Sequence, residues 1–174
     1  VIYPGTNVSI CAGSTVTLST GTASSFAWSN GANTPTITVG ANGTHTVTLT
    51  GSNGCTATSA VSTITVNPIP VATITAAGST NICSGTSVNL TASTAGSYLW
   101  SNGATTQTIA ASLAGTYTVT VTTAGCSATS ASTSVNVNPA PTALVTASGP
   151  TSFCQGGSVS FTANAGNGYT YLWN

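Results

Sequence analysis

The residues of this chain with the greatest capacity for chemistry are its five cysteines, which are Cys11, Cys55, Cys83, Cys126 and Cys154. A cysteine side chain can act as a nucleophile, bind a metal or form a disulfide. No Cys-x-x-Cys pair and no cluster of cysteine with histidine occurs, although these patterns are typical of zinc and redox sites. We therefore predict disulfides, rather than catalytic or metal-binding cysteines.

The cysteines recur with the repeat of the chain, which suggests how they pair. Pairing within each repeat joins Cys11 to Cys55 and Cys83 to Cys126, and it leaves Cys154 to a partner outside this sequence. Each such bridge would stabilise a small module by a few kcal/mol, because it restricts the unfolded chain. A bridge between neighbouring modules or subunits is the alternative pairing.

His45 and the three tryptophans also have two interpretations each. His45 could bind a metal or accept a proton, but it occupies the inward-facing position of Tyr117 in an equivalent strand, so we predict a structural role. Trp28, Trp100 and Trp173 could form a stacking platform for sugars. Their regular place after the first cysteine of each repeat favours core residues that pack against the disulfide, as in immunoglobulin sandwiches.

Polar side chains offer candidate sites of modification. Asn-x-Ser/Thr sequons occur at Asn7, Asn42 and Asn89. Asn89 lies between Val88 and Leu90 in an alternating pattern, so its side chain is expected to face solvent. The rows of threonine could be ordinary strand surface, glycan acceptors or an ice-binding array. We predict ordinary strand surface, with glycosylation as the second interpretation, and the twist of sandwich sheets argues against the flat array that ice binding needs.

The absence of charge excludes several classes of function. The chain contains no Asp, Glu, Lys or Arg among its 174 residues. It therefore has no carboxylate acid–base pair, no carboxylate cage for a metal and no cation for phosphate, and we predict no enzyme activity and no cofactor. Binding to nucleic acid and to anionic membranes depends on the same missing cations. No apolar stretch is long enough to insert into a membrane.

Neutrality also predicts a partner. Without net charge, strand-rich proteins lack the repulsion that keeps copies apart, and their sheet edges can associate. We therefore expect other copies of the same chain as partners, with glycans as a further candidate. The cysteine content points to an oxidising compartment, so we predict an extracellular or cell-surface location.

An internal repeat defines the domain organisation. The signature Ile10-Cys11-Ala12-Gly13 returns as Ile82-Cys83-Ser84-Gly85 and as Phe153-Cys154-Gln155-Gly156. We predict modules at residues 1–68, 69–139 and 140–174, the third lacking its second half and either truncated or completed by a neighbour. Within each module apolar and polar residues alternate, as from Gly115 to Thr122, which predicts short strands. The fold class is therefore all-β, with tandem immunoglobulin-like sandwiches.

Turn and linker residues complete this prediction. Asn30-Gly31 and Asn102-Gly103 follow the tryptophan strands and are typical of tight hairpins. Pro68-Ile69-Pro70 and Pro139-Ala140-Pro141 separate the modules. Pro-x-Pro favours a stiff, extended connector, so we expect an elongated array.

The combined pattern resembles a known family. Trp-Ser-Asn-Gly-Ala at 28–32 and 100–104, Gly-Thr-Tyr-Thr-Val-Thr-Val at 115–121 and Gly-Cys at 54–55 and 125–126 are similar to the immunoglobulin-like and PKD-like repeats of large secreted Bacteroidota surface proteins. The resemblance covers essentially the whole chain and implies stalks, adhesins or fibres exported by type IX secretion. The acidic turn typical of PKD modules is absent here, so a calcium site is not implied.

Three functions follow as hypotheses. The leading one is a structural repeat protein of an extracellular fibre or filament that self-assembles through its neutral modules. The alternative is an adhesin stalk or a carbohydrate-binding surface array. A third is a spacer attached to a secreted enzyme.

Overall fold

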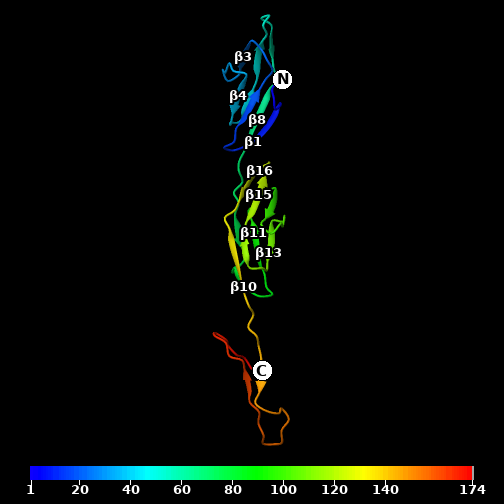
Figure 1. The fold of residues 1–174 in the computed structure, drawn as a ribbon, viewed down its shortest axis with the longest axis vertical. Coiled ribbons are helices and arrows are strands. Elements are labelled where there is room, and N and C mark those ends of the chain that lie inside the picture. Colours follow the sequence, from blue (N-terminus) through cyan, green and yellow to red (C-terminus); the bar gives the residue numbers. More distant parts are fainter. Residues whose placement is uncertain (174) are drawn as a thin grey trace.

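The structure is a computed structural model that describes residues 1–173, and it is all-β and elongated. Two β-sandwiches follow one another along the long axis, and a smaller C-terminal segment (residues 140–173) continues the line (Figure 1). No helix occurs among these residues. The predicted fold class, tandem immunoglobulin-like sandwiches, is therefore confirmed, while the three domain boundaries remain predictions.

The first sandwich contains eight strands. Its strands are β1 (Asn7–Cys11), β2 (Val16–Ser19), β3 (Ser25–Trp28), β4 (Thr36–Val39), β5 (Gly43–His45), β6 (Val47–Thr50), β7 (Thr56–Thr58) and β8 (Ser62–Asn67). β1 runs parallel to β8, β5 pairs with β8, and β6 pairs with both β3 and β7. The hydrogen-bonded sheets are therefore β1-β8-β5, β3-β6-β7 and β2-β4.

The second sandwich repeats this arrangement. Its strands are β9 (Ile74–Ala76), β10 (Asn81–Cys83), β11 (Val88–Ala92), β12 (Ser97–Trp100), β13 (Thr108–Ala111), β14 (Gly115–Tyr117), β15 (Val119–Thr123), β16 (Cys126–Thr129) and β17 (Thr133–Asn138). β10 runs parallel to β17, as β1 does to β8. β11 lies between β9 and β13 in the opposite sheet.

Each sandwich closes around its own apolar core. The tryptophan is at the centre in both, with Trp28 4% exposed and Trp100 2% exposed. Around Trp28 lie Ile2, Leu18, Ile37, Val47 and Ile64. Around Trp100 lie Val88, Leu90, Ile109, Val119, Val121 and Val135, among others. The period-two pattern thus places the apolar residues inside as predicted, since alternate side chains of a strand point to opposite faces.

The predicted strand at Gly115 to Thr122 is interrupted by a β-bulge. β14 and β15 pair with β17 and β16, so the four strands form one long hairpin. Between the pairs Tyr117↔Thr133 and Thr120↔Thr129, one side of the hairpin has two residues and the other has three. The extra residue breaks the ladder of backbone hydrogen bonds, as is general for bulges.

Ser130 replaces the hydrogen bonding that the bulge removes. Its Oγ accepts a hydrogen bond from the Val119 backbone N–H at 3.1 Å and donates one to the Ala131 carbonyl at 2.8 Å. The first sandwich has the same arrangement, because Ser59 Oγ accepts from the Val47 N–H at 3.1 Å. The buried serine therefore satisfies a backbone donor in the core.

Replacing Ser130 by alanine is expected to destabilise the second sandwich by about 1–3 kcal/mol, the usual cost of leaving a buried donor without a partner. Urea denaturation of the wild-type and S130A chains measures this difference. Ser134→Ala in β17 is the matched control, because Ser134 is exposed. Equal midpoints for the two variants would contradict the role of the Ser130 hydroxyl.

Two local predictions need correction. The turns at Asn30-Gly31 and Asn102-Gly103 exist, but they are not hairpins, because the strands on either side pair with different partners. The chain passes from one sheet to the other at these turns. The alternation at Tyr171 and Trp173 forms no strand in the structure. The C-terminal segment has only β18 (Val145–Ala147) paired with β19 (Phe161–Ala163).

Candidate functional site

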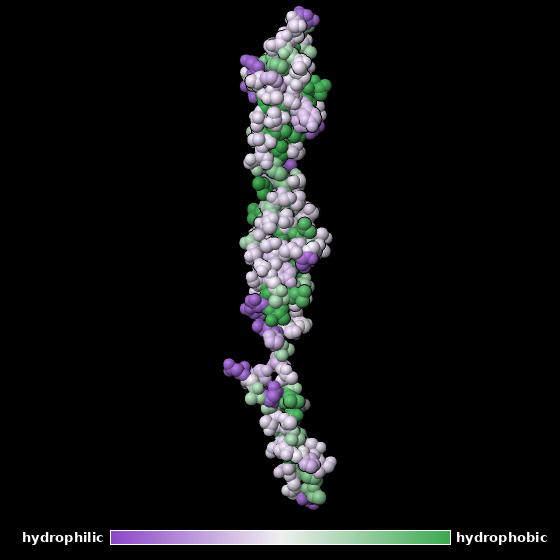
Figure 2. All heavy atoms as spheres, viewed as in Figure 1, coloured by the Kyte–Doolittle hydropathy of each residue, from purple (hydrophilic) through white to green (hydrophobic). Residues whose placement is uncertain are grey.

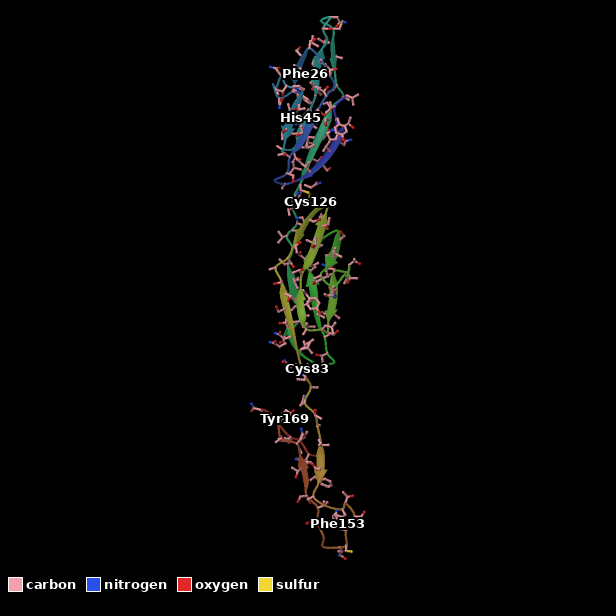
Figure 3. The ribbon with its side chains drawn as sticks, in the orientation of Figure 1. Phe26, His45, Cys83, Cys126, Phe153 and Tyr169 are labelled. Atoms are coloured by element: carbon pink, nitrogen blue, oxygen red, sulfur yellow. A yellow bond between two sulfur atoms is a disulfide. The ribbon has the colours of Figure 1, made fainter. Side chains whose placement is uncertain are left out.

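The most distinctive site is the junction between the two sandwiches, where a disulfide joins them. Cys11 ends β1 at the lower end of the first sandwich, and Cys126 begins β16 at the upper end of the second. Their sulfur atoms are bonded, with the two Cα atoms 5.6 Å apart. Cys126 is only 2% exposed. Figure 3 places it between the two sandwiches.

A hydrogen bond accompanies this covalent bond. The Asn67 side-chain Nδ2 donates to the Ala124 carbonyl at 3.1 Å, across the junction. Asn67 is the last residue of β8 and pairs with Cys11, while Ala124 lies in the turn just before Cys126. Ala124 and Gly125 both adopt positive φ, 50° and 79°, which makes a tight two-residue turn. The hairpin tip of one sandwich is therefore held against the strand ends of the other.

The predicted pairing within modules is wrong, and the strand geometry explains why. Cys55 directly precedes β7, whereas Cys11 lies beside Asn67, the last residue of β8. At about 3.3 Å per residue, the run from 55 to 67 spans roughly 35–40 Å. A disulfide needs Cα atoms within about 7 Å. Cys83, beside Asn138, is separated from Cys126 in the same way.

The other three cysteines, Cys55, Cys83 and Cys154, are exposed and form no disulfide within residues 1–173. Cys83 lies at the lower end of the second sandwich, opposite to Cys126 (Figure 3). The predicted partner of Cys154 lies outside the sequence, and that pairing remains a prediction.

The other candidate residues take no part in this disulfide junction. Trp28 and Trp100 are buried, and their Nε1 atoms donate to the Thr34 and Thr106 carbonyls, each at 2.8 Å. Neither tryptophan packs against a disulfide, because the described cores contain no cysteine in their apolar clusters. His45 is half-buried on β5, and its Nδ1 is buried without a hydrogen-bond partner in the described chain.

The sequon asparagines Asn7, Asn42 and Asn89 are all exposed. Asn42 Oδ1 accepts a hydrogen bond from the Val66 N–H at 2.6 Å. Threonine hydroxyls pair across neighbouring strands, for example Thr120 with Thr129 at 2.9 Å. These hydroxyls satisfy one another as an ordinary strand surface, and glycosylation of the asparagines remains a prediction.

Trp173 is not a core residue, contrary to the prediction, because 55% of its surface is exposed. It lines an open hollow of about 410 Å³ with Leu144, Tyr169 and Tyr171. In the second sandwich the equivalent Trp100 is buried in a core to which β11, β13, β14, β15 and β17 contribute. Residues 140–173 contain no counterpart of β13, β14, β15 or β17. The exposed aromatic cluster therefore corresponds to the interior of an immunoglobulin-like sandwich.

No other chemical site emerges from residues 1–173. They contain no group of three or more histidine, cysteine or acidic residues that could hold a metal ion. They also contain no helix of the length and apolarity that a membrane crossing requires. Figure 2 shows a surface of mostly intermediate hydropathy, with scattered apolar patches.

Comparisons with known proteins find only distant similarity to solved structures. No family model matches the sequence, and no curated protein matches it. One similar chain comes from the crystal structure of the mouse coronavirus receptor-binding domain complexed with its murine receptor. The match has a TM-score of 0.48 and 14% identity, and it covers 75% of this chain and 96% of that chain. The fibronectin(III)-like modules of Clostridium thermocellum CbhA give a TM-score of 0.40 with 14% identity, over 79% of this chain and 95% of that chain.

The N-terminal four Ig domains of Dscam1 isoform 1.9 give a TM-score of 0.37 with 14% identity, and the match covers 76% of this chain and 43% of that chain. At these identities and TM-scores the similarity adds nothing about activity. The immunoglobulin-like fold rests on the strand order and the two cores. A disulfide and an immunoglobulin-like fold together fit an extracellular module.

Proposed function

We propose that this chain is a structural repeat protein of an extracellular fibre or filament and that its partners are other copies of itself. The observation that carries the proposal is the junction, where the Cys11–Cys126 disulfide and the Asn67 hydrogen bond fix two sandwiches end to end. A covalent bond beside a stiff Pro68-Ile69-Pro70 linker restricts bending. Such a rod resists extension, which is the property that a fibre requires.

The surface supports the same role. Without Asp, Glu, Lys or Arg, neighbouring copies do not repel one another, and the edges of the sheets can pair. The resemblance to secreted Bacteroidota repeats supports an extracellular location of this kind. Glycans on Asn7, Asn42 or Asn89 would keep such a neutral surface soluble before assembly.

Electron microscopy of the native material tests the proposal. Ordered filaments with repeated contacts between sandwiches of neighbouring copies are the expected result. Isolated flexible strings without lateral contacts would overturn it. They would favour the alternative, an adhesin stalk or carbohydrate-binding surface array.

The neutral composition predicts that stability is insensitive to salt. Raising NaCl from 0.01 to 0.5 M is expected to change the free energy of unfolding by less than about 0.5 kcal/mol, because few charges are present to be screened. Urea denaturation at the two salt concentrations measures this change. A charged immunoglobulin-like domain serves as the control, and a change in this chain as large as in the control would contradict the prediction.

A further inference from the structure

The two halves of the junction are repeated at the free ends of the described sandwiches. The lower half consists of a cysteine paired in parallel register with the last asparagine of the neighbouring strand, as Cys11 pairs with Asn67. Cys83 and Asn138 form the same pair at the lower end of the second sandwich. The next residue repeats as well, since the Ala12 N–H donates to the Asn67 carbonyl at 2.9 Å and the Ser84 N–H to the Asn138 carbonyl at 2.7 Å.

The upper half is also present twice. It consists of a cysteine that follows a glycine of positive φ at the tip of a hairpin, as Cys126 follows Gly125. Cys55 follows Gly54, whose φ is 81°, at the tip between β6 and β7. The first sandwich therefore presents an upper half at its free end, and the second sandwich presents a lower half.

We infer that the junction disulfide is repeated at every contact between sandwiches. Cys83 bonds with the hairpin-tip cysteine of the sandwich that follows it, and Cys55 bonds with the lower-end cysteine of a sandwich that precedes it. The partner is thus a thiol of the same kind of module, either in the same polypeptide or in a second copy. The array then becomes one line of covalently joined sandwiches.

The positions of the thiols exclude pairing inside the second sandwich. Cys83 and Cys126 lie at opposite ends of this sandwich (Figure 3), and Cys126 is already bonded to Cys11. Cys83 is exposed, as a thiol must be to meet a partner on another module. The repeated geometry of its surroundings, rather than the cysteine alone, makes it a half-site.

The bond forms by oxidation. Two S–H bonds break and one S–S bond forms, with the release of two protons and two electrons. The electrons reduce a disulfide oxidant, either oxidised glutathione or the disulfide of an oxidoreductase, to two thiols. This inference rests on the proposed extracellular function, because such an oxidant acts outside a reducing cytosol.

Disulfide mapping of the unreduced native protein tests the inference. Free thiols are alkylated in denaturant. The chain contains no Lys or Arg for trypsin, so it is digested with thermolysin, which cleaves before residues such as Val61 and Ile64 and thereby separates Cys55 from Cys83. We expect loss of alkylation at Cys83 and a linked peptide that joins it to a Gly-Cys hairpin tip. Linkage to the Cys55 peptide identifies a second copy, and linkage to a peptide outside residues 1–174 identifies a further module.

Alkylated Cys83 without reduction, or Cys83 linked to any cysteine that is not at a hairpin tip, would overturn the inference. The Cys83→Ser chain is expected to lose this linked peptide and keep the Cys11–Cys126 one, which shows that the variant still folds. Microscopy separates this inference from the proposed function. Filaments with alkylated Cys83 refute only the disulfide, and linked Cys83 without filaments refutes only the fibre.

Discussion

Replacing Cys11 by serine is expected to destabilise the tandem sandwiches and to let them bend at Pro68-Ile69-Pro70. The bond closes a loop of sequence separation 115. The chain-entropy model gives about 4.7 kcal/mol for a loop of about 100 residues. Part of that loop is already ordered when one sandwich unfolds beside the other, so we expect a loss of about 2–4 kcal/mol.

Urea denaturation measures the loss of stability, and small-angle X-ray scattering measures the spread of end-to-end lengths. Cys83→Ser is the matched control in the isolated chain, because Cys83 has the same structural position but is not bonded there. The C11S chain is expected to unfold at lower urea and to show a broader distribution of lengths than the C83S chain. Indistinguishable variants would show that the disulfide does not hold the two sandwiches in line.

The strands and cores of this protein could be predicted from the sequence, because they depend on local alternation. Val119 and Val121 face inward with the period of two, and Trp100 lies among them. The repeat also predicted that the second sandwich copies the first. Each of these features depends on neighbouring residues or on a direct comparison of repeats.

The disulfide pairing could not be predicted in the same way, since it depends on where strands lie in three dimensions. The parallel pairing of β1 with β8 brings Cys11 to the end of β8, and alternation alone does not reveal strand direction. The sequence did contain one signal against pairing within the module. Cys55 comes just before the last two strands of its repeat, and the linker comes just after them, so Cys55 lies far from the linker end of the module. Cys55, at the start of these strands, cannot reach Cys11, which lies beside Asn67 at their end.

The exposure of Trp173 has a related cause. Its neighbours repeat those of Trp100, so the local pattern predicts the same burial. Burial, however, requires the strands that cover the side chain, which come later in the repeat. A local pattern therefore predicts which face is apolar, and only the complete set of strands determines whether that face is covered.

Replacing Trp100 by alanine is expected to cost about 3–5 kcal/mol, as is usual for a fully buried tryptophan. Trp100 is 2% exposed and donates a hydrogen bond to the Thr106 carbonyl at 2.8 Å. A small domain is stable by only about 5–15 kcal/mol, so this loss removes a large share of the stability of the second sandwich. Differential scanning calorimetry is expected to show a much lower transition temperature for that sandwich.

Trp173→Ala is the matched control, because it makes the same substitution at the equivalent position of the C-terminal segment. Trp173 is 55% exposed, so its removal is expected to change stability by less than about 0.5 kcal/mol, the usual range for a surface substitution. Equal losses in the two variants would mean that Trp173 is buried in solution, through contact with strands of another module or copy. A large loss for W100A alone is the expected result, because only Trp100 is surrounded by a core to which the later strands of the repeat contribute.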